Sequence, residues 1–252
     1  MKKKIVTVRN IKIGTGRPKI CVPLVAKDEM ELQAALDQLE NSPFDLVEWR
    51  ADFYRDVEQE EARRKAFEKI RRKIGGRPLL FTFRTAAEGG NREISNAAYF
   101  SLNRAVGESA LADLVDIEIS RDEELAADLG EILHSRGVYA IGSNHDFEKT
   151  PATEEMIRRL CRMQELDMDI TKLAVMPQCR RDVLRLLEAA VAMEEEKGDR
   201  PCITMSMGEL GMISRIAGKL TGSALTFGTA GFASAPGQLP AEAVAELLEL
   251  LA

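Results

Sequence analysis

The sequence predicts a single-domain (β/α)8 barrel, an α/β fold, and three observations support this prediction. Short apolar runs rich in β-branched residues recur about eight times from residue 19 onward, and such runs are typical of buried strands. Each run is followed by a longer segment with helical spacing, and strands that alternate with helices pair in parallel through crossovers. The chain has 252 residues, which is also a usual size for one such barrel.

The expected strands follow one another at regular intervals after a short N-terminal segment. We predict a small β-hairpin in residues 1–17, because the turn sequence GTGR (14–17) separates VTVRN from the first apolar run. The barrel then occupies residues 18–252, and no linker or charge block divides it. Its strands are expected at 19–25, 45–52, 78–85, 114–120, 138–146, 170–176, 202–208 and 224–230.

Three of the segments that follow strands carry clear helix signals. Thr150 followed by Pro151 is typical of an N-cap with proline at the first helical position. The apolar spacing over 181–196 predicts a helix with one buried stripe, and PAEAVAELLELLA predicts a final helix. The apolar faces expected for the first two helices consist of Met156, Ile157, Leu160 and Cys161, and of Val183, Leu184, Leu187, Ala190 and Val191.

The composition favours a soluble, cytoplasmic protein. Lys and Arg total 35 and Asp and Glu total 41, and the net charge of −6 argues against binding nucleic acid or a membrane surface. No apolar segment approaches the roughly 18 residues needed to cross a bilayer, and the basic N-terminus is not followed by a signal-peptide core. The four cysteines show no C-x-x-C spacing, so we expect reduced thiols. With only His134 and His145, a multi-histidine metal site is excluded.

Ionisable residues interrupt most of the expected strands, where charged side chains are costly unless they are paired or functional. Alternate positions of a barrel strand point to the same side, so Glu48 and Arg50 must share one face. We expect such groups to converge on the C-terminal mouth of the lumen, where barrels of this type build their active sites. The others are Arg84 and Glu88, Asp116 and Glu118, His145, Lys172, Arg215, and the stretch 234–238.

Each of these residues also has a structural interpretation. Glu48 and Arg50 could form an ion pair with each other. The same alternative stays open for Asp116 and Glu118. The glycine-rich stretch 222–237 is most simply a flexible loop. The alternating methionines 205 and 207 are of a type that more often packs than binds.

Lys172 lies within the apolar run ITKLAVM and allows two interpretations. A lysine at a strand edge is commonly a surface residue that hinders aggregation. A lysine inside the lumen behaves differently, because desolvation and nearby cations such as Arg50, Arg84 and Arg215 disfavour its charged form. The neutral amine that results is the nucleophile of Schiff-base enzymes.

His145 ends the fifth expected strand in the run SNHD, where it could be a core histidine or a catalytic base. Its position at the predicted mouth, with Glu88 available from a neighbouring connection, favours the second interpretation. Imidazole is the side chain best suited to moving protons near neutral pH. A lysine imine, a histidine base and a set of arginines suit elimination or aldol chemistry on a small anionic ketone.

Several motifs in a fixed order extend this interpretation. The stretches LVEWRAD, LLFTFRTAAEGG, SNHDF, ITKLAVMPQ, ITMSMGELGMISR and SAPGQ together resemble the type I 3-dehydroquinate dehydratase family over residues 18–252. The resemblance implies a lyase that removes water in a syn elimination from 3-dehydroquinate to give 3-dehydroshikimate, a step of the shikimate pathway of aromatic amino-acid biosynthesis. It also implies a homodimer that needs no metal and no organic cofactor.

The resemblance assigns the family's functional residues position by position. Lys172 would form the imine with the substrate ketone, His145 would transfer the protons, and Glu88 would orient His145. Pro23 stands where some relatives have a hydroxyl residue, so no contact is assigned to it. The implied substrate-binding residues are Glu48, Arg50, Arg84, Arg215, Ser234 and Gln238, the last two on a loop that closes over the substrate.

Two rival functions stay open on the sequence alone. Another imine-forming barrel, such as a class I aldolase, would share Lys172 but would not need the arginine set together with SAPGQ. A binding or regulatory barrel without turnover would have no need of a covalent amine and a histidine base. The sequence also leaves open whether the enzyme serves biosynthesis or quinate catabolism.

Overall fold

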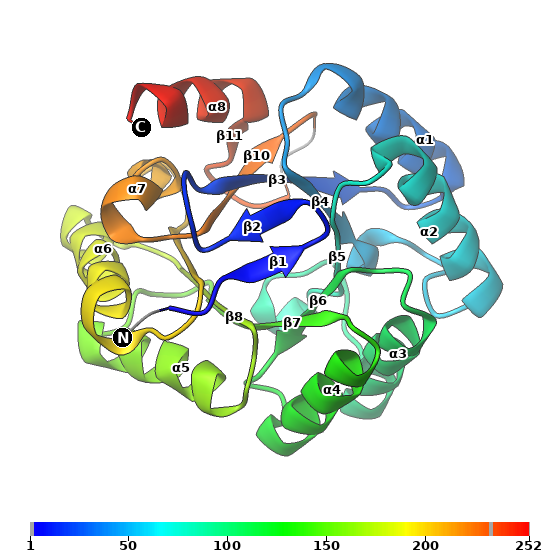
Figure 1. Cartoon of the computed structure of the whole chain (residues 1–252), viewed down its shortest axis with the longest axis horizontal. Helices are drawn as coiled ribbons and strands as arrows, with labels where there is room; N and C mark the ends of the chain where they lie inside the picture. The colour runs from blue at the N-terminus through cyan, green and yellow to red at the C-terminus, as the bar shows by residue number, and fades with distance from the viewer. Residues whose placement is uncertain (1–2, 232–233, 252) are drawn as a thin grey trace.

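The predicted barrel is confirmed by the computed structural model, which describes residues 3–231 and 234–251 (Figure 1). Within these residues the barrel strands are β3 (Lys19–Val25), β4 (Leu46–Arg50), β5 (Leu79–Thr82), β6 (Leu114–Glu118), β7 (Tyr139–Asp146), β8 (Ile170–Val175), β9 (Cys202–Ser206) and β10 (Leu225–Thr229). The helices that follow them are α1 (Glu29–Gln38), α2 (Glu60–Ile74), α3 (Asn96–Ser109), α4 (Glu123–Ser135), α5 (Thr153–Glu165), α6 (Arg180–Ala192), α7 (Gly218–Thr221) and α8 (Ala241–Leu250). The ends of the predicted domain at residues 1 and 252, and positions 232–233 of the glycine-rich stretch, lie outside the described residues.

The strands form one parallel sheet that curls until β9 and β10 meet. Around the sheet the order is β10–β3–β4–β5–β6–β7–β8–β9, so neighbours in sequence are neighbours in space. β9 and β10 join through a bridge between Cys202 and Ser223, and the amide of Ala224 donates to the carbonyl of Cys202 at 2.8 Å. A two-residue strand, β11 (Leu239–Pro240), pairs with the end of β10. None of the described helices has the length and apolar character needed to cross a membrane.

The predicted N-terminal hairpin is present, but its turn lies elsewhere. β1 (Val6–Val8) and β2 (Ile11–Ile13) pair antiparallel, and Figure 1 shows them in front of the barrel opening. The turn between them contains Arg9, whose φ of 52° is the left-handed conformation that a two-residue hairpin turn needs. The GTGR sequence instead connects β2 to β3, so its glycines mark a connection and not the hairpin itself.

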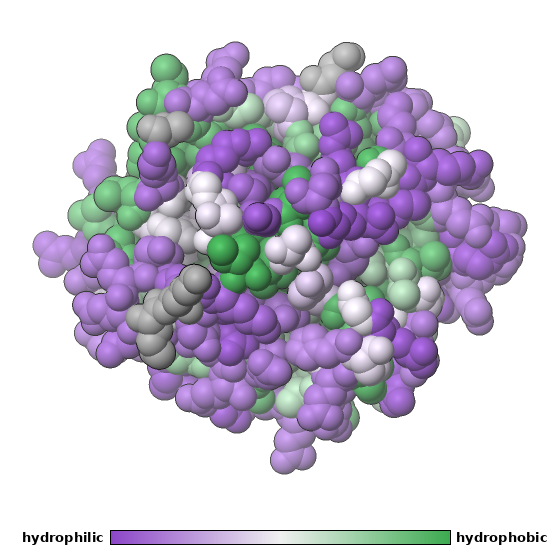
Figure 2. Space-filling model, viewed as in Figure 1, coloured by the Kyte–Doolittle hydropathy of each residue, from purple (hydrophilic) through white to green (hydrophobic). Residues whose placement is uncertain are grey.

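The lumen behind the hairpin is apolar. Val6, Val8 and Ile13 of the hairpin are at most 2% exposed and belong to the same hydrophobic cluster as the lumen residues. Figure 2 shows the outside of this end, where hydrophilic residues surround a small hydrophobic centre. The hairpin therefore covers the N-terminal end of the lumen. Each barrel strand contributes one residue to the layer that it covers: Cys21, Leu46, Leu80, Leu114, Ile141, Ile170, Ile203 and Leu225.

A repeated hydrogen bond joins the barrel strands in pairs at this N-terminal end. The side chain just before every second strand accepts the backbone amide of the preceding strand. The acceptors are Asp45, Asp113, Asp169 and Ser223, and their donors are the amides of Ile20, Leu79, Ala140 and Thr204, at 2.8, 2.8, 2.9 and 3.1 Å. The three aspartates also contact Arg17, Arg71 and His134, respectively. We call these four the strand-pair acceptors.

The start of α5 differs from the expectation. The helix begins at Thr153, and Ala152 is its N-cap, so Thr150 and Pro151 precede it. The hydroxyl of Thr150 donates to the carbonyl of Met176 at 3.0 Å, on the next connection. The Thr150 hydroxyl, which the local pattern assigns to capping the helix, is therefore engaged in a tertiary hydrogen bond instead.

The buried stripe of α6 also differs from the expectation. Val183, Leu186 and Ala190 are buried, whereas Leu184 is 65% exposed and Leu187 is only partly buried. Successive residues of a helix are about 100° apart, so the buried face is turned by a fraction of a turn from the predicted one. Two apolar faces were available in this sequence, and packing against the sheet selected one of them.

Candidate active site

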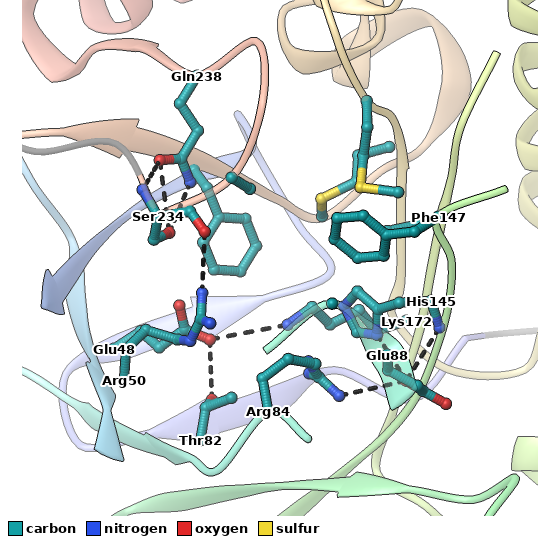
Figure 3. Close-up of a pocket in the computed structure, with 16 residues that line it drawn as sticks. Glu48, Arg50, Thr82, Arg84, Glu88, His145, Phe147, Lys172, Ser234 and Gln238 are labelled. Atoms are coloured by element: carbon teal, nitrogen blue, oxygen red, sulfur yellow. Dashed lines mark hydrogen bonds and ion pairs between the residues drawn. The ribbon is translucent and has the colours of Figure 1, made fainter. Parts of the chain in front are cut away.

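A pocket opens at the C-terminal end of the lumen, beyond the apolar layer (Figure 3). Side chains of a strand alternate between its faces, so the residue two positions beyond each member of the apolar layer also points inward. On β4, β5, β6, β7 and β8 this residue is polar or ionisable. Eight of the nine predicted site residues line this pocket: Glu48, Arg50, Arg84, Glu88, His145, Lys172, Ser234 and Gln238. The ninth, Arg215, is buried beside the loop that covers the pocket.

Lys172 projects from β8 into the pocket and is 3% exposed, which excludes a surface role. Its Nζ lies 3.0 Å from a carboxylate oxygen of Asp116 and 3.8 Å from one of Glu48. The amine also lies 4.9 Å from the centre of the Phe227 ring. The nearest charges are therefore carboxylates and not the arginines that the sequence suggested. These two carboxylates, Asp116 and Glu48, are the charged groups paired with the lysine nitrogen.

Arg84 connects the charged groups of the pocket. Its guanidinium lies 2.8 Å from Asp116, 2.8 Å from Glu118 and 3.3 Å from Glu88. Asp116 and Glu118 are two residues apart on β6, so they share a face, and their contacts with Arg84 place both inside the barrel. Burial by itself would raise the pKa of Asp116, but Arg84 and Lys172 hold it well below its usual value. The question that the sequence left open is settled in favour of an ion-pair cluster that includes both carboxylates.

Glu88 and His145 form a second unit at the mouth. Nδ1 of His145 lies 2.9 Å from a carboxylate oxygen of Glu88, and the His145 amide donates to the same oxygen at 3.0 Å. Burial, together with the charges of Arg84 and Lys172, lowers the pKa of His145 well below 6.5. The ring is therefore neutral at pH 7. Because an ionised Glu88 accepts the proton on Nδ1, Nε2 is left as the free base.

The loop after β10 lies over the pocket and is held partly by Arg50. The guanidinium of Arg50 donates to the carbonyl of Ser234 at 3.1 Å and pairs with Asp52 at 2.8 and 2.9 Å. Gln238 fixes the loop internally, since its amide oxygen accepts from the Ser234 amide at 2.7 Å. Figure 3 shows Ser234 and Gln238 above Glu48 and Arg50.

Arg215 holds the other part of this loop. It donates to the carbonyl of Pro236 at 2.8 Å, and the Gly208 amide donates to the same carbonyl at 3.3 Å. Gly237 (φ +73°) permits this approach, because a Cβ there would lie 2.3 Å from the Gly208 carbonyl oxygen. Burial lowers the pKa of Arg215 to about 10, and its Nε has no hydrogen-bond partner among the described residues. A buried guanidinium with an unused donor is suited to bind an anion.

Apolar side chains form the rest of the pocket wall. Met205 and Met207, which the sequence assigned to packing, line the pocket with Phe147 and Phe227. Gly89 (φ +77°) lies under the Phe147 ring, where a Cβ would come within 2.2 Å of a ring atom. The paired glycines after Arg84 were therefore a usable signal for this wall, whereas nothing in the sequence marked Phe147. The arrangement combines an amine and a neutral base in the pocket with the Nε donor of Arg215, unused among the described residues, beside the loop that covers it. This suits covalent catalysis on a small anionic carbonyl compound.

Comparison with known proteins gives the family. A family model described as type I 3-dehydroquinase matches residues 20–252. The chain belongs to this family. The match covers the barrel except for Lys19, the first residue of β3, and it includes every residue that lines the pocket.

Relatives of the type I 3-dehydroquinase family are similar over their full length. The 3-dehydroquinate dehydratase of Bacillus licheniformis is 53% identical over 249 residues, which are 99% of this chain and 98% of that protein. The one from Syntrophotalea carbinolica is 48% identical over 98% of this chain and 97% of its own. Among solved structures, the type I 3-dehydroquinate dehydratase of Clostridium difficile with covalent modified comenic acid has a TM-score of 0.95 and 45% identity, and covers 99% of this chain and 98% of its own.

Proposed function

We propose that this protein dehydrates 3-dehydroquinate to 3-dehydroshikimate through a Schiff base on Lys172. The observation that carries the proposal is a buried lysine amine that shares one pocket with a neutral histidine, in a chain of this family. An amine is the nucleophile that converts a ketone into an imine, and the neutral histidine supplies the base that the next step requires. The names of the relatives supply the substrate.

Imine formation is the first half of the proposed reaction. Lys172 gives its ammonium proton to His145, and the amine lone pair attacks the carbonyl carbon of the substrate. A proton of the attacking nitrogen passes to the former ketone oxygen, which becomes a hydroxyl, and His145 then returns its proton to that hydroxyl, which leaves as water. The lysine nitrogen is cationic before it gives its proton to His145 and again in the protonated imine. Asp116 and Glu48, at 3.0 and 3.8 Å from Nζ, are placed to neutralise either cation.

Elimination is the second half. The cationic imine acidifies the adjacent C–H, and Nε2 of His145 removes that proton, so the C–H electron pair moves into an enamine. The enamine expels the hydroxyl group one carbon further on, and His145 donates the same proton to it, which yields water. A single base that works on both groups accounts for a syn elimination. Water finally hydrolyses the imine, which releases the product and the lysine.

We assign substrate recognition to the arginines and the loop. Arg215 is proposed to bind the substrate carboxylate, because its buried Nε has no hydrogen-bond partner in the part of the chain that the structure describes. Glu48, Arg50 and Arg84 are proposed to bind hydroxyl and carboxylate oxygens from the opposite wall. Ser234 and Gln238 would close over the substrate from the loop, which excludes water from the imine.

Two measurements test the proposal. The formation of 3-dehydroshikimate is followed by its ultraviolet absorbance, and sodium borohydride is added during turnover to reduce the imine. Mass spectrometry of peptides should then find the reduced adduct on Lys172 and not on the exposed Lys219. No rise in absorbance would refute the dehydratase activity, and an adduct elsewhere, or none, would refute the assignment of Lys172.

The role of His145 is tested by separating the two halves. The variant His145→Ala should still accumulate a covalent adduct with substrate, seen in the intact mass, because water can transfer the protons of imine formation in place of His145, although more slowly. It should eliminate water about 10²–10⁴ times more slowly than the wild type. A wild-type rate in this variant would remove His145 from the elimination step.

We also propose that the protein serves the shikimate pathway in the cytoplasm as a homodimer. The four described cysteines are free, which suits a reducing compartment. The dimer rests on the family resemblance, and light scattering after gel filtration tests it against the chain mass of 27.9 kDa. A particle of that mass over a wide concentration range would exclude the dimer.

A further inference from the structure

The carboxylate of Glu88 is held from behind by residues that do not line the pocket. Its Oε2 faces the pocket side and accepts from the backbone amide and Nδ1 of His145, with Arg84 at 3.3 Å. Its Oε1 accepts from the hydroxyl of Ser120 at 2.5 Å and from the side-chain amide of Asn144 at 3.1 Å. The two oxygens therefore have separate sets of donors, one catalytic and one without an assigned role.

We infer that Asn144, oriented by Arg159 and assisted by Ser120, is a positioning residue that keeps Glu88 ionised and aligned for His145. The inference rests on the proposed function, since it concerns how the base of that reaction is prepared. Asn144 lies between Ser143 and His145 on β7, so its side chain points to the opposite face of the sheet, towards α5. It can therefore act on the reaction only through Glu88.

Arg159 decides which end of the Asn144 amide meets Glu88. Nη1 of Arg159 donates to Oδ1 of Asn144 at 2.9 Å, which turns the NH2 group towards the carboxylate. The reversed amide would set an oxygen against the Glu88 carboxylate and a nitrogen against the guanidinium, and both contacts would be repulsive. Arg159 is itself fixed by Glu155 at 2.8 Å, and its Nη1 lies 3.7 Å from Asp146. A surface ion pair on α5 thus selects the orientation of an amide behind the active site.

The charged groups around Glu88 and His145 show why hydrogen bonds to Oε1 of Glu88 matter for its ionisation. Arg84 and Asp116 face Glu88, and Arg84, Lys172, Asp116 and Glu118 face His145. Burial raises the pKa of Glu88, while Arg84 and the hydrogen bonds from Ser120 and Asn144 oppose this rise. Without the Asn144 donor, Glu88 and His145 should together take up a proton at a higher pH. A protonated pair cannot remove the C–H proton, so the acid limb of the activity profile should move to higher pH.

The test compares variants behind Glu88 with a matched control on the same helix. Arg158 and Arg159 are adjacent and both bind Glu155, but only Arg159 reaches Asn144. We expect Asn144→Ala to lower kcat about 10–100-fold with a smaller change in KM, and to move the acid limb of kcat/KM up by about one pH unit. Asn144→Asp should move it further, because it sets a second carboxylate against Glu88. Ser120→Ala and Arg159→Ala should move it in the same direction, and Arg158→Ala should match the wild type.

A second readout does not depend on turnover. The titration of the His145 ring can be followed by nitrogen NMR in the full-length protein, with its signals distinguished from those of His134 by a His134→Gln variant. Proton uptake by the ring should begin at higher pH in Asn144→Asp than in the wild type. An unchanged acid limb and an unchanged ring titration in both Asn144 variants would overturn the positioning role, even if stability fell. A wild-type protein that forms no 3-dehydroshikimate would instead refute the proposed function, and the NMR comparison would still decide the role of Asn144.

Discussion

The two ends of one lumen are built from the same strands but from opposite kinds of side chain. At the N-terminal end, each strand contributes an apolar residue, and the hairpin covers the layer. Two residues further along, β4, β6 and β8 contribute Glu48, Asp116 and Lys172, and the lysine pairs with both carboxylates. Because side chains on a strand repeat every two residues, a step of about 7 Å separates the two layers.

The difference shows how one fold divides stability from chemistry. Burial of apolar groups is non-directional and tolerates many sequences of similar volume. The ion-pair cluster at the other end needs each partner, since a buried charge left alone is strongly destabilising. Substitutions at the N-terminal end should therefore change the free energy of unfolding and leave kcat unchanged, whereas substitutions at the C-terminal end should lower kcat whatever they do to stability.

The largest expected effect is the loss of the lysine amine. Lys172→Met keeps the length of the side chain but removes the nucleophile, so we expect kcat to fall by at least about four orders of magnitude. Dehydroshikimate absorbance measures the rate, and circular dichroism checks the fold. Lys219→Met, at an exposed position of α7, is the matched control and should leave kcat unchanged. Measurable turnover by a correctly folded Lys172→Met enzyme would contradict the assignment of the chemistry to the C-terminal end of the lumen.

A core truncation in the apolar layer should have the opposite signature. Leu80 is fully buried there, and Leu80→Ala should lower the free energy of unfolding by about 2–5 kcal/mol without changing kcat of the folded enzyme at 25 °C. Urea unfolding followed by circular dichroism gives the free energy. The same change at Leu184, which is 65% exposed, should cost less than about 0.5 kcal/mol. A large loss of kcat in Leu80→Ala would mean that the two layers are coupled.

Much of this comparison could be predicted from the sequence. The eight strands, the inward direction of Glu48 and Arg50, and the C-terminal mouth follow from the two-residue period of strands. The neighbours of Lys172 did not follow, because the height at which residues of different strands meet depends on the register around the barrel. Thus Asp116, and not an arginine, lies nearest the amine. The common face of Asp116 and Glu118 could be predicted from the sequence. Their contacts with Arg84 could not, because these depend on the register between neighbouring strands.

The local errors have a similar physical origin. The start of α5 was wrong because the hydroxyl of Thr150 binds a distant carbonyl, and no local pattern reveals such a partner. The stripe of α6 was right for Val183 and Ala190 but wrong for Leu184, because Leu184 and Leu186 are both apolar and composition could not select the face. Asn144 was overlooked because its side chain points away from the pocket.

A smaller effect is expected from the strand-pair acceptors. Asp113 accepts the Leu79 amide and pairs with Arg9 and Arg71, so Asp113→Ala should cost about 1–3 kcal/mol of unfolding free energy and leave kcat unchanged. Asp128→Ala, at an exposed position of α4, is the control. Thermal unfolding and the dehydroshikimate assay check both variants. If Asp113→Ala were as stable as the wild type, water would be as good a hydrogen-bond partner for the Leu79 amide as Asp113 is.

The smallest effect concerns pH. The pKa of His145 is lowered in the folded state, so below about pH 6.5 the unfolded chain binds a proton that the folded chain does not. This contribution to stability is therefore complete above that pH and is lost as the pH falls. Glu88, whose pKa is raised by burial, acts with the opposite sign at lower pH. The slope of the melting temperature between pH 6.5 and 5.5 should be shallower in His145→Gln than in the wild type, and an equal slope would contradict the neutral buried ring.

The strand-pair acceptors also bear on where the chain tolerates insertions. Each acceptor ties two strands together, β3 to β4, β5 to β6, β7 to β8 and β9 to β10, so the N-terminal turns fall into two kinds. A turn that leads from one pair to the next, such as residues 75–78 or 136–138, carries no acceptor, and added residues there displace none. A turn within a pair ends in an acceptor, and added residues would pull Asp45, Asp113, Asp169 or Ser223 away from its amide. In modular terms, the chain is a ring of four two-stranded units, and extra segments are best accommodated between units.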